Sequence, residues 1–153
     1  MTWAGAAVAG AAAVADAYGA VAKEQGISTG CDIQNGVTLH GDRNRIKQLV
    51  IILLDNGIKY NRENGSINVS LSAARNDVRI KVSDTGIGIP EQELREVFHR
   101  FKRGAKARVK NPEGTGLGLA IAWMIAKGHG GDILVQSKSG EGTCMTVRLP
   151  LQA

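Results

Sequence analysis

The chain has 153 residues, of which 43% are hydrophobic and 22% are charged, a composition that predicts one globular domain over residues 1–153. Its net charge of +5 suits an anionic ligand, either a polyphosphate or a nucleic acid, and does not choose between the two. Cys31 and Cys144 are far apart and have no metal-like spacing, which favours a reducing, cytoplasmic setting.

The N-terminal segment is rich in alanine and glycine. Residues 1–15 are predicted to start a first helix over about 4–25, because alanine favours helices even though each glycine there costs about 1 kcal/mol. The segment is too short and too weakly apolar for a membrane span, and it lacks the basic start of a signal peptide. We therefore expect this domain to make no direct membrane contact.

Short strands are predicted on both sides of a central helix. Residues 27–39 contain strand candidates that are broken at Gly30 and at residues 35–36. Further along, apolar and polar residues alternate over 66–74 and 77–84, which predicts two strands joined as a hairpin.

The central helix is predicted to run from Asp42, a suitable N-cap, to about Tyr60. One broad apolar face is formed by Ile46, Leu49, Val50, Leu53, Leu54 and Ile58. Asn56 and Lys59 lie near its C-terminal end. An asparagine in this place is commonly a solvated or capping residue, and the Asn56-Gly57 pair is also consistent with a simple helix terminus.

The stretch over residues 84–90, DTGIGIP, follows the second hairpin strand directly. Asp84 is expected at the C-terminal end of this strand, and Gly86 and Gly88 then allow a sharp turn and a close approach by a ligand. An aspartate that is partly shielded from water can accept a charge-assisted hydrogen bond from an amine. The alternative is a plain Asp-Thr-Gly turn without a ligand.

A basic segment follows a short helix predicted to begin at Pro90 and to end near residues 98–101. Of the eleven residues 100–110, six are lysine or arginine and none is acidic. The segment is consistent with a solvated loop or with a lid whose charge attracts phosphates. A nucleic-acid patch is disfavoured, because only 4% of the residues are aromatic and could stack on bases.

A second glycine cluster consists of Gly114, Thr115, Gly116, Leu117 and Gly118. It begins a helix predicted over 115–127, whose free backbone N–H groups and dipole favour phosphate binding. The GxGxG spacing is neither that of a Rossmann fingerprint nor that of a P-loop. Two more strands are predicted over 132–137 and 143–149.

The order of these elements predicts an α/β fold, a two-layer α/β sandwich with a mixed sheet covered on one face by helices. Over residues 16–150 the chain resembles the ATP-binding catalytic domain of bacterial sensor histidine kinases. These belong to the Bergerat-fold (GHKL) superfamily, shared with gyrase, MutL and the heat-shock chaperone ATPase. The resemblance is carried by an N box at 42–48 and 53–60, by a first glycine box at 84–89 and by the glycine cluster at 114–118.

The resemblance implies a role for each matching residue. Asn56 would bind Mg²⁺ bridging the phosphates of ATP, with Lys59 and Tyr60 along the nucleotide, and Asp84 would accept a hydrogen bond from the adenine amine. The implied catalytic residues are Asn56, Lys59, Arg100 and Arg103. The implied ATP-binding residues are Asn56, Lys59, Tyr60, Asp84, Gly86, Gly88, Ile89, Phe101, Gly114, Thr115, Gly116, Leu117, Gly118 and Thr143. Phe98 and Phe101 resemble the F box that anchors an ATP lid at 99–113.

The sequence departs from the family pattern at three points. Ile52 stands where the family usually has a polar residue, and isoleucine can neither ligate a metal nor position water. Gly57 stands where alanine is usual, which should loosen the helix. None of His40, His99 and His129 is followed by the acid-Arg-Pro pattern of a phosphoacceptor. The chain is therefore expected to bind ATP without phosphorylating itself.

The leading hypothesis is a histidine kinase catalytic domain that positions Mg·ATP for transfer to a histidine on a separate dimerisation domain in the same receptor. Its implied partners are that domain and a response regulator, with no nucleic acid, in the cytoplasmic part of a membrane-anchored receptor. The alternative is a pseudo-kinase that binds nucleotide without chemistry, which Ile52 supports. A hydrolysing ATPase is disfavoured, because Ile52 replaces the expected base.

Overall fold

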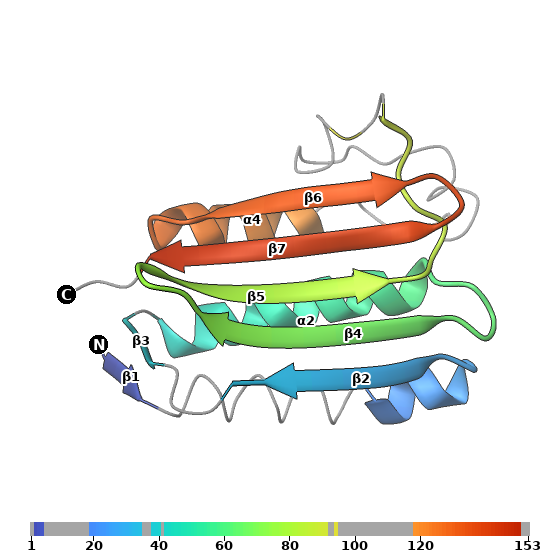
Figure 1. Ribbon diagram of the computed structural model, residues 1–153, viewed down its shortest axis with the longest axis horizontal. Helices are drawn as coiled ribbons and strands as arrows, with labels where there is room; N and C mark the ends of the chain where they lie inside the picture. The colour runs from blue at the N-terminus through green and yellow to red at the C-terminus, as the bar shows by residue number, and fades with distance from the viewer. Residues whose placement is uncertain are drawn as a thin grey trace.

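A mixed five-stranded sheet with helices on one face forms the body of the protein, and a separate two-stranded ladder lies near the N-terminus (Figure 1). The computed structural model describes residues 2–4, 19–34, 38–40, 42–91, 94 and 118–150. The strands are β1 (Thr2–Ala4), β2 (Ser28–Ile33), β3 (Thr38–His40), β4 (Ser66–Ala73), β5 (Asp77–Asp84), β6 (Asp132–Lys138) and β7 (Gly142–Pro150). The labelled helices are α2 (Arg43–Lys59) and α4 (Gly118–Gly128), and residues 19–24 are also helical.

The strand order in the large sheet is β2-β4-β5-β7-β6. β2 runs parallel to β4, and the other neighbours are antiparallel. The register places Asp84 opposite Thr143, and Thr143 opposite Ser137. These three residues therefore form one row across the end of β5, β7 and β6, on the same face of the sheet.

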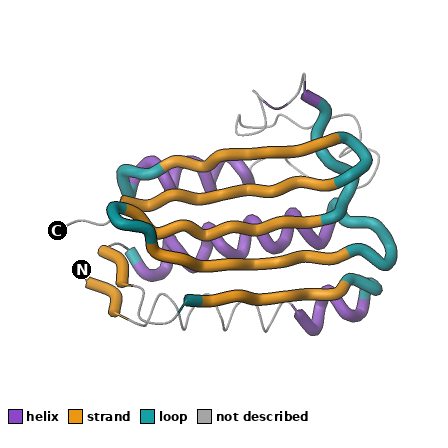
Figure 2. Tube along the Cα trace, viewed as in Figure 1, coloured by secondary structure: helices purple, strands orange, loops and turns teal. Residues whose placement is uncertain are grey.

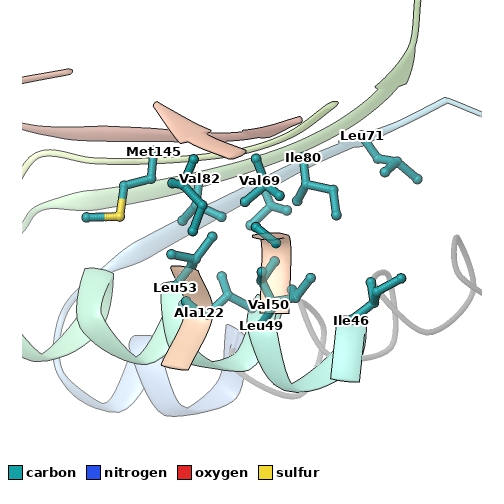
Figure 3. Close-up of a cluster of buried hydrophobic side chains, with 14 of the residues drawn as sticks. Ile46, Leu49, Val50, Leu53, Val69, Leu71, Ile80, Val82, Ala122 and Met145 are labelled. Atoms are coloured by element: carbon teal, nitrogen blue, oxygen red, sulfur yellow. The ribbon is translucent and has the colours of Figure 1, made fainter. Parts of the chain in front are cut away.

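The core lies between the sheet and the helices. Alternate residues of β4 and β5 are buried against α2, and their neighbours face solvent. In Figure 3, Leu49, Val50 and Leu53 of α2 point toward Val82 and Ile80 of the sheet. Ala122, which is fully buried, brings α4 into the same cluster. The predicted two-layer sandwich is confirmed.

Helix α2 begins and ends where the sequence predicted. The Asp42 side chain accepts hydrogen bonds from the backbone N–H of Asn44 and of Arg45, at 3.0 and 3.2 Å, and so caps the first turn. Tyr60 is the C-cap, and its N–H donates to Asn56 O. Within the part of the chain that the structure describes, no helix is long and apolar enough to cross a membrane.

Two predictions about the first forty residues were wrong. The first helix does not begin at residue 4, because Ala4 belongs to β1 and pairs with Thr38; Trp3 in the same strand is a residue type that favours extended backbone. Gly30 does not break its strand, because β2 runs through it in register with Asn68, whose side chain fills the space that a Cβ on Gly30 would need.

Several predicted segments lie outside the described residues. They include most of the first helix, most of the helix after Pro90, the lid at 99–113 and the start of the glycine cluster. The predicted strands at 66–74, 77–84, 132–137 and 143–149 all form, with ends that differ by no more than one residue from the prediction.

Candidate functional site

The described site residues lie at one end of the sheet, where β5 and β6 end, β7 begins and α2 reaches its C-terminus (Figures 1 and 2). Asp84 is the last residue of β5. Its Cβ lies 3.7 Å from the position that a Cβ on Gly57 of α2 would occupy, so the last turn of α2 packs directly against the aspartate. A helix end and a strand end therefore meet at one carboxyl group.

The Asp84 carboxyl is half-buried and is held by backbone donors. One of its oxygens accepts a hydrogen bond of 2.8 Å from the Gly86 N–H, and the backbone of Thr143 also donates to the carboxyl. Burial raises the pKa of Asp84 from 3.8 to about 6, and the two backbone hydrogen bonds offset only part of that rise. At neutral pH the group is thus a poorly solvated anion, which favours a donor from a ligand.

The glycines around Asp84 are required by close backbone contacts. A Cβ on Gly86 would collide with the carbonyl oxygen of Tyr60, and one on Gly88 would collide with the backbone of Lys138. Gly88 also has a φ of +71°, which side-chain-bearing residues rarely adopt. The turn after β5 is therefore pressed between the end of α2 and the end of β6.

A hydroxyl pair fixes this turn to the last two strands. Ser137 Oγ accepts a hydrogen bond of 2.7 Å from the Ile89 N–H and donates one of 2.9 Å to Gly142 O. The Ser137 Oγ also lies 2.7 Å from Thr143 Oγ1. Both hydroxyls lie in the same row as Asp84. Thr143, which the resemblance predicted as a site residue, contacts the aspartate through its backbone. Ile89, also predicted, is linked to the same row through its hydrogen bond to Ser137.

A second polar network, built on Asn61, was not predicted. Asn61 is only 2% exposed, and its amide donates to Ser66 O at 3.0 Å while its oxygen accepts from the Arg62 N–H at 2.9 Å. Thr85 Oγ1 donates to Asn61 Oδ1 at 3.4 Å and accepts from the Ser66 N–H at 2.8 Å. Asn61 thus joins the end of α2 to the residue directly after Asp84.

The C-terminal half of α2 carries the other described candidates. Asn56 is half-buried, and Lys59 is exposed with its ammonium 2.9 Å from the Asp55 carboxylate. Ile52 lies one turn before Asn56 on the same side of the helix. The Ile52 Cγ2 is 3.5 Å from the place where a Cβ on Gly118 would lie, so this side of α2 faces the first turn of α4.

The structure brings together part of the predicted site. Asp84, Gly86, Gly88, Ile89 and Thr143 adjoin one another, and Gly57 places the end of α2 against them. Gly118 begins α4. Asn56, Lys59 and the C-cap Tyr60 lie at the C-terminal end of α2. The other predicted residues, Phe98, Arg100, Phe101, Arg103, Gly114, Thr115, Gly116 and Leu117, lie outside the described residues.

The described residues near the end of α2 offer few ligands for the implied Mg²⁺. Among the described residues, no three His, Cys, Asp or Glu side chains gather where they could hold a metal ion. Asn56 offers one amide oxygen, and Ile52 beside it offers none. This set fits an ion held mainly by phosphate oxygens and water, which is how Mg²⁺ usually binds with nucleotides. It does not fit a metal caged by protein alone.

Comparison with known proteins agrees with this geometry. The chain belongs to the family of histidine kinase-, DNA gyrase B-, and HSP90-like ATPases, whose model matches residues 41–153. It is 42% identical to the sensor histidine kinase YkoH of Bacillus subtilis over 119 residues, which are 78% of this chain and 26% of YkoH. It is 41% identical to the sensor histidine kinase WalK of the same organism over 111 residues, 71% of this chain and 18% of WalK.

The fold is that of a histidine kinase catalytic domain. The solved catalytic domain of histidine kinase ThkA superimposes with a TM-score of 0.83 at 26% identity, covering 98% of this chain and 96% of that one. The chain spans about a quarter or less of the length of YkoH and WalK. The predicted family, fold class and ATP-binding character are confirmed.

Proposed function

We propose that this chain binds Mg·ATP and positions its γ-phosphoryl group for transfer to a histidine on a separate dimerisation domain. The observation that carries the proposal is the half-buried, partly desolvated Asp84 carboxyl at the sheet end, followed by a turn whose close backbone contacts admit no Cβ at Gly86 or Gly88. An anionic acceptor in such a place suits the exocyclic amine of adenine.

The phosphates are proposed to extend from Asp84 toward α4. The first turn of α4 offers backbone N–H groups and the positive end of a helix dipole, and Gly118 begins it. Asn56 and Lys59 of α2 are proposed to face the phosphates, Asn56 as the protein ligand of Mg²⁺. The ion would supply positive charge that neutralises the phosphate oxygens. Arg100 and Arg103 are proposed to add charge from the lid.

The reaction is a displacement at phosphorus. A ring nitrogen of the acceptor histidine forms a bond to the γ-phosphorus, the bond to the β–γ bridging oxygen breaks, and ADP leaves. This chain contributes mainly position and charge, because such transfers need an aligned nucleophile and a stabilised leaving group. The nucleophile belongs to the dimerisation domain.

We propose that the dimerisation domain lies in the same polypeptide, and that a response regulator then receives the phosphoryl group. Support comes from the named sensor kinases, of which this chain matches a quarter or less. We propose further that the domain works in the cytoplasm as part of a membrane-anchored receptor.

A pseudo-kinase is the second candidate. The half-buried Ile52 favours it, because it packs against the core near Gly118 and offers no oxygen one turn before Asn56. A domain of this kind would bind ATP and transfer nothing.

Calorimetric titration with the non-hydrolysable analogue AMP-PNP tests the proposal, with and without Mg²⁺, on the parent and on Asp84→Asn. We expect saturable binding that Asp84→Asn weakens by about 1–3 kcal/mol, the cost of a compromised buried polar contact. Ser72→Ala on the exposed face of β4 is the matched control and should bind as the parent does. Parent protein that is folded and binds no AMP-PNP would refute the ATP site.

Transfer of ³²P from ATP to a supplied dimerisation domain separates the two candidates. Labelled histidine supports the kinase. Tight ATP binding without transfer to any of several supplied domains supports the pseudo-kinase, and in that case Ile52→Asn is the variant to test for restored transfer.

A further inference from the structure

We infer that Ser137 is a positioning residue that accepts the hydrogen bond of the Thr143 hydroxyl. The part of the site that binds the nucleotide base then offers only hydrogen-bond acceptors and selects adenine over guanine. The inference rests on the proposed function and deepens it. It comes from the row of Asp84, Thr143 and Ser137 across the ends of β5, β7 and β6.

Counting protons around Ser137 gives the direction of each hydrogen bond. A serine hydroxyl has one proton and two acceptor lone pairs. The Ile89 N–H can only donate, so it uses a lone pair of Ser137 Oγ at 2.7 Å. The Gly142 carbonyl can only accept, so the single Ser137 proton is directed to it at 2.9 Å.

The remaining contact of Ser137 is therefore directed from Thr143. The two hydroxyl oxygens are 2.7 Å apart, and Ser137 has a lone pair left but no proton. With all three contacts made, Thr143 donates to Ser137, so only lone pairs remain on its oxygen for a bound base. The side chain of Thr143 thus becomes an acceptor although threonine as a residue type can also donate.

The same row places this acceptor beside Asp84. The backbone of Thr143 donates to the Asp84 carboxyl, and Gly86 donates to it as well, so two backbone donors hold the carboxylate in its acceptor form. Adenine has an amine on its six-membered ring where guanine has a carbonyl oxygen. Two acceptors attract the amine and repel the carbonyl oxygen, since a buried acceptor that faces another acceptor is unpaired.

Removing the Ser137 hydroxyl should change selectivity and not only affinity. In Ser137→Ala, Thr143 Oγ1 loses its acceptor, so its proton is free to turn toward a ligand. We expect the ratio of AMP-PNP to GMP-PNP affinity, measured by calorimetry at about pH 8 where Asp84 is ionised, to fall about tenfold. Ser137→Thr keeps the hydroxyl and should restore the parent ratio. Ser72→Ala should leave it unchanged.

A second variant assigns the effect to Thr143. Thr143→Val removes the hydroxyl with little change of shape, so it should weaken AMP-PNP binding without improving GMP-PNP binding. In the double variant that carries both Ser137→Ala and Thr143→Val, the gain in GMP-PNP binding from Ser137→Ala should disappear, because the Thr143 hydroxyl proton that could turn toward the ligand is absent. Circular dichroism on every variant checks that the fold is retained.

The outcomes separate this inference from the proposed function. An equal loss of both affinities in Ser137→Ala, with the ratio unchanged, would mean that Ser137 only holds the turn at Ile89 and would overturn the inference alone. A changed ratio that survives Thr143→Val would overturn it too. A folded parent that binds neither nucleotide would overturn the proposed function, and the inference with it.

Discussion

The carboxyl of Asp84 carries an energetic cost at the scale of a single residue. Its pKa in the folded protein, about 6, lies above the value of 3.8 for a solvated aspartate, because burial disfavours the charge. The folded state therefore binds this proton more tightly than the unfolded chain does. The contribution of Asp84 to the free energy of unfolding is most favourable below about pH 4 and is lost as the pH rises to about 6.

Asp84→Asn should therefore stabilise the protein while it weakens nucleotide binding. A rise in pKa from 3.8 to about 6 corresponds to about 3 kcal/mol at neutral pH. Asparagine removes the buried charge and keeps one acceptor for the Gly86 N–H, so we expect a gain of about 1–2 kcal/mol at pH 8 that vanishes near pH 4. Urea unfolding at both pH values measures it. A gain that is the same at both pH values would mean that burial of charge is not its cause.

Asn61 is expected to be the most costly polar side chain to remove near the site. It is 2% exposed and bonds Ser66, Thr85 and its own neighbour Arg62. Asn61→Ala leaves the Ser66 carbonyl and the Thr85 hydroxyl without this partner, so the free energy of unfolding should fall by about 2–3 kcal/mol. Chemical denaturation checks the value.

The matched control for Asn61 is Asn76→Ala. Asn76 is exposed in the turn between β4 and β5, and its loss should change the free energy of unfolding by no more than about 0.5 kcal/mol. Equal effects at the two asparagines would contradict the structural role of Asn61.

At the scale of elements, α2 packs closely against the sheet at Gly57. Alanine there would gain about 1 kcal/mol of helix propensity. Its Cβ would lie 3.0 Å from the Cδ1 of Ile67, which is 1% exposed and has little space to move. The glycine therefore trades helix propensity for close packing against β4, next to Asp84.

Gly57→Ala should consequently destabilise the protein, by about 0.5–2 kcal/mol, because overpacking outweighs propensity. In an Ile67→Val background, where Cδ1 is absent, the same substitution should be neutral or stabilising. A double-mutant cycle by urea denaturation measures this coupling. Additive effects of the two substitutions would show that the contact with Ile67 does not determine the residue at position 57.

The elements differ in how far the sequence determines them. α2 could be predicted almost to the residue, because its apolar period of 3.6 and its cap at Asp42 agree. β4 to β7 could be predicted from period-two alternation. The strand β1 could not, since Ala4 is extended where it pairs with Thr38, and composition carries no information on such a partner. Gly30 stays within β2 for a similar tertiary reason, the side chain of Asn68.

At the scale of the whole molecule, the candidate site could likewise be predicted only in part from the sequence. Asp84 and its glycines form a continuous stretch, so their chemistry could be predicted locally. The roles of Asn61 and Ser137 depend on residues 24 and 48 positions away, Thr85 and Ile89, and only the folded register reveals them. The site therefore depends on segments from α2, β5, β6 and β7, and occupancy by a ligand should stabilise the whole domain.

Nucleotide binding should accordingly raise the melting temperature. At a concentration one hundred times Kd, AMP-PNP with Mg²⁺ stabilises the folded state by about 2.7 kcal/mol, which for a domain of this size corresponds to about 5–10 °C. The rise should shrink as the pH falls below about 6, because protonated Asp84 loses the negative charge that strengthens its hydrogen bond from the base. Differential scanning fluorimetry of the parent and of Asp84→Asn tests this. Since the variant lacks the titrating carboxyl, its smaller rise should not depend on pH in this way, and an identical pH profile in both proteins would remove Asp84 from the base contact.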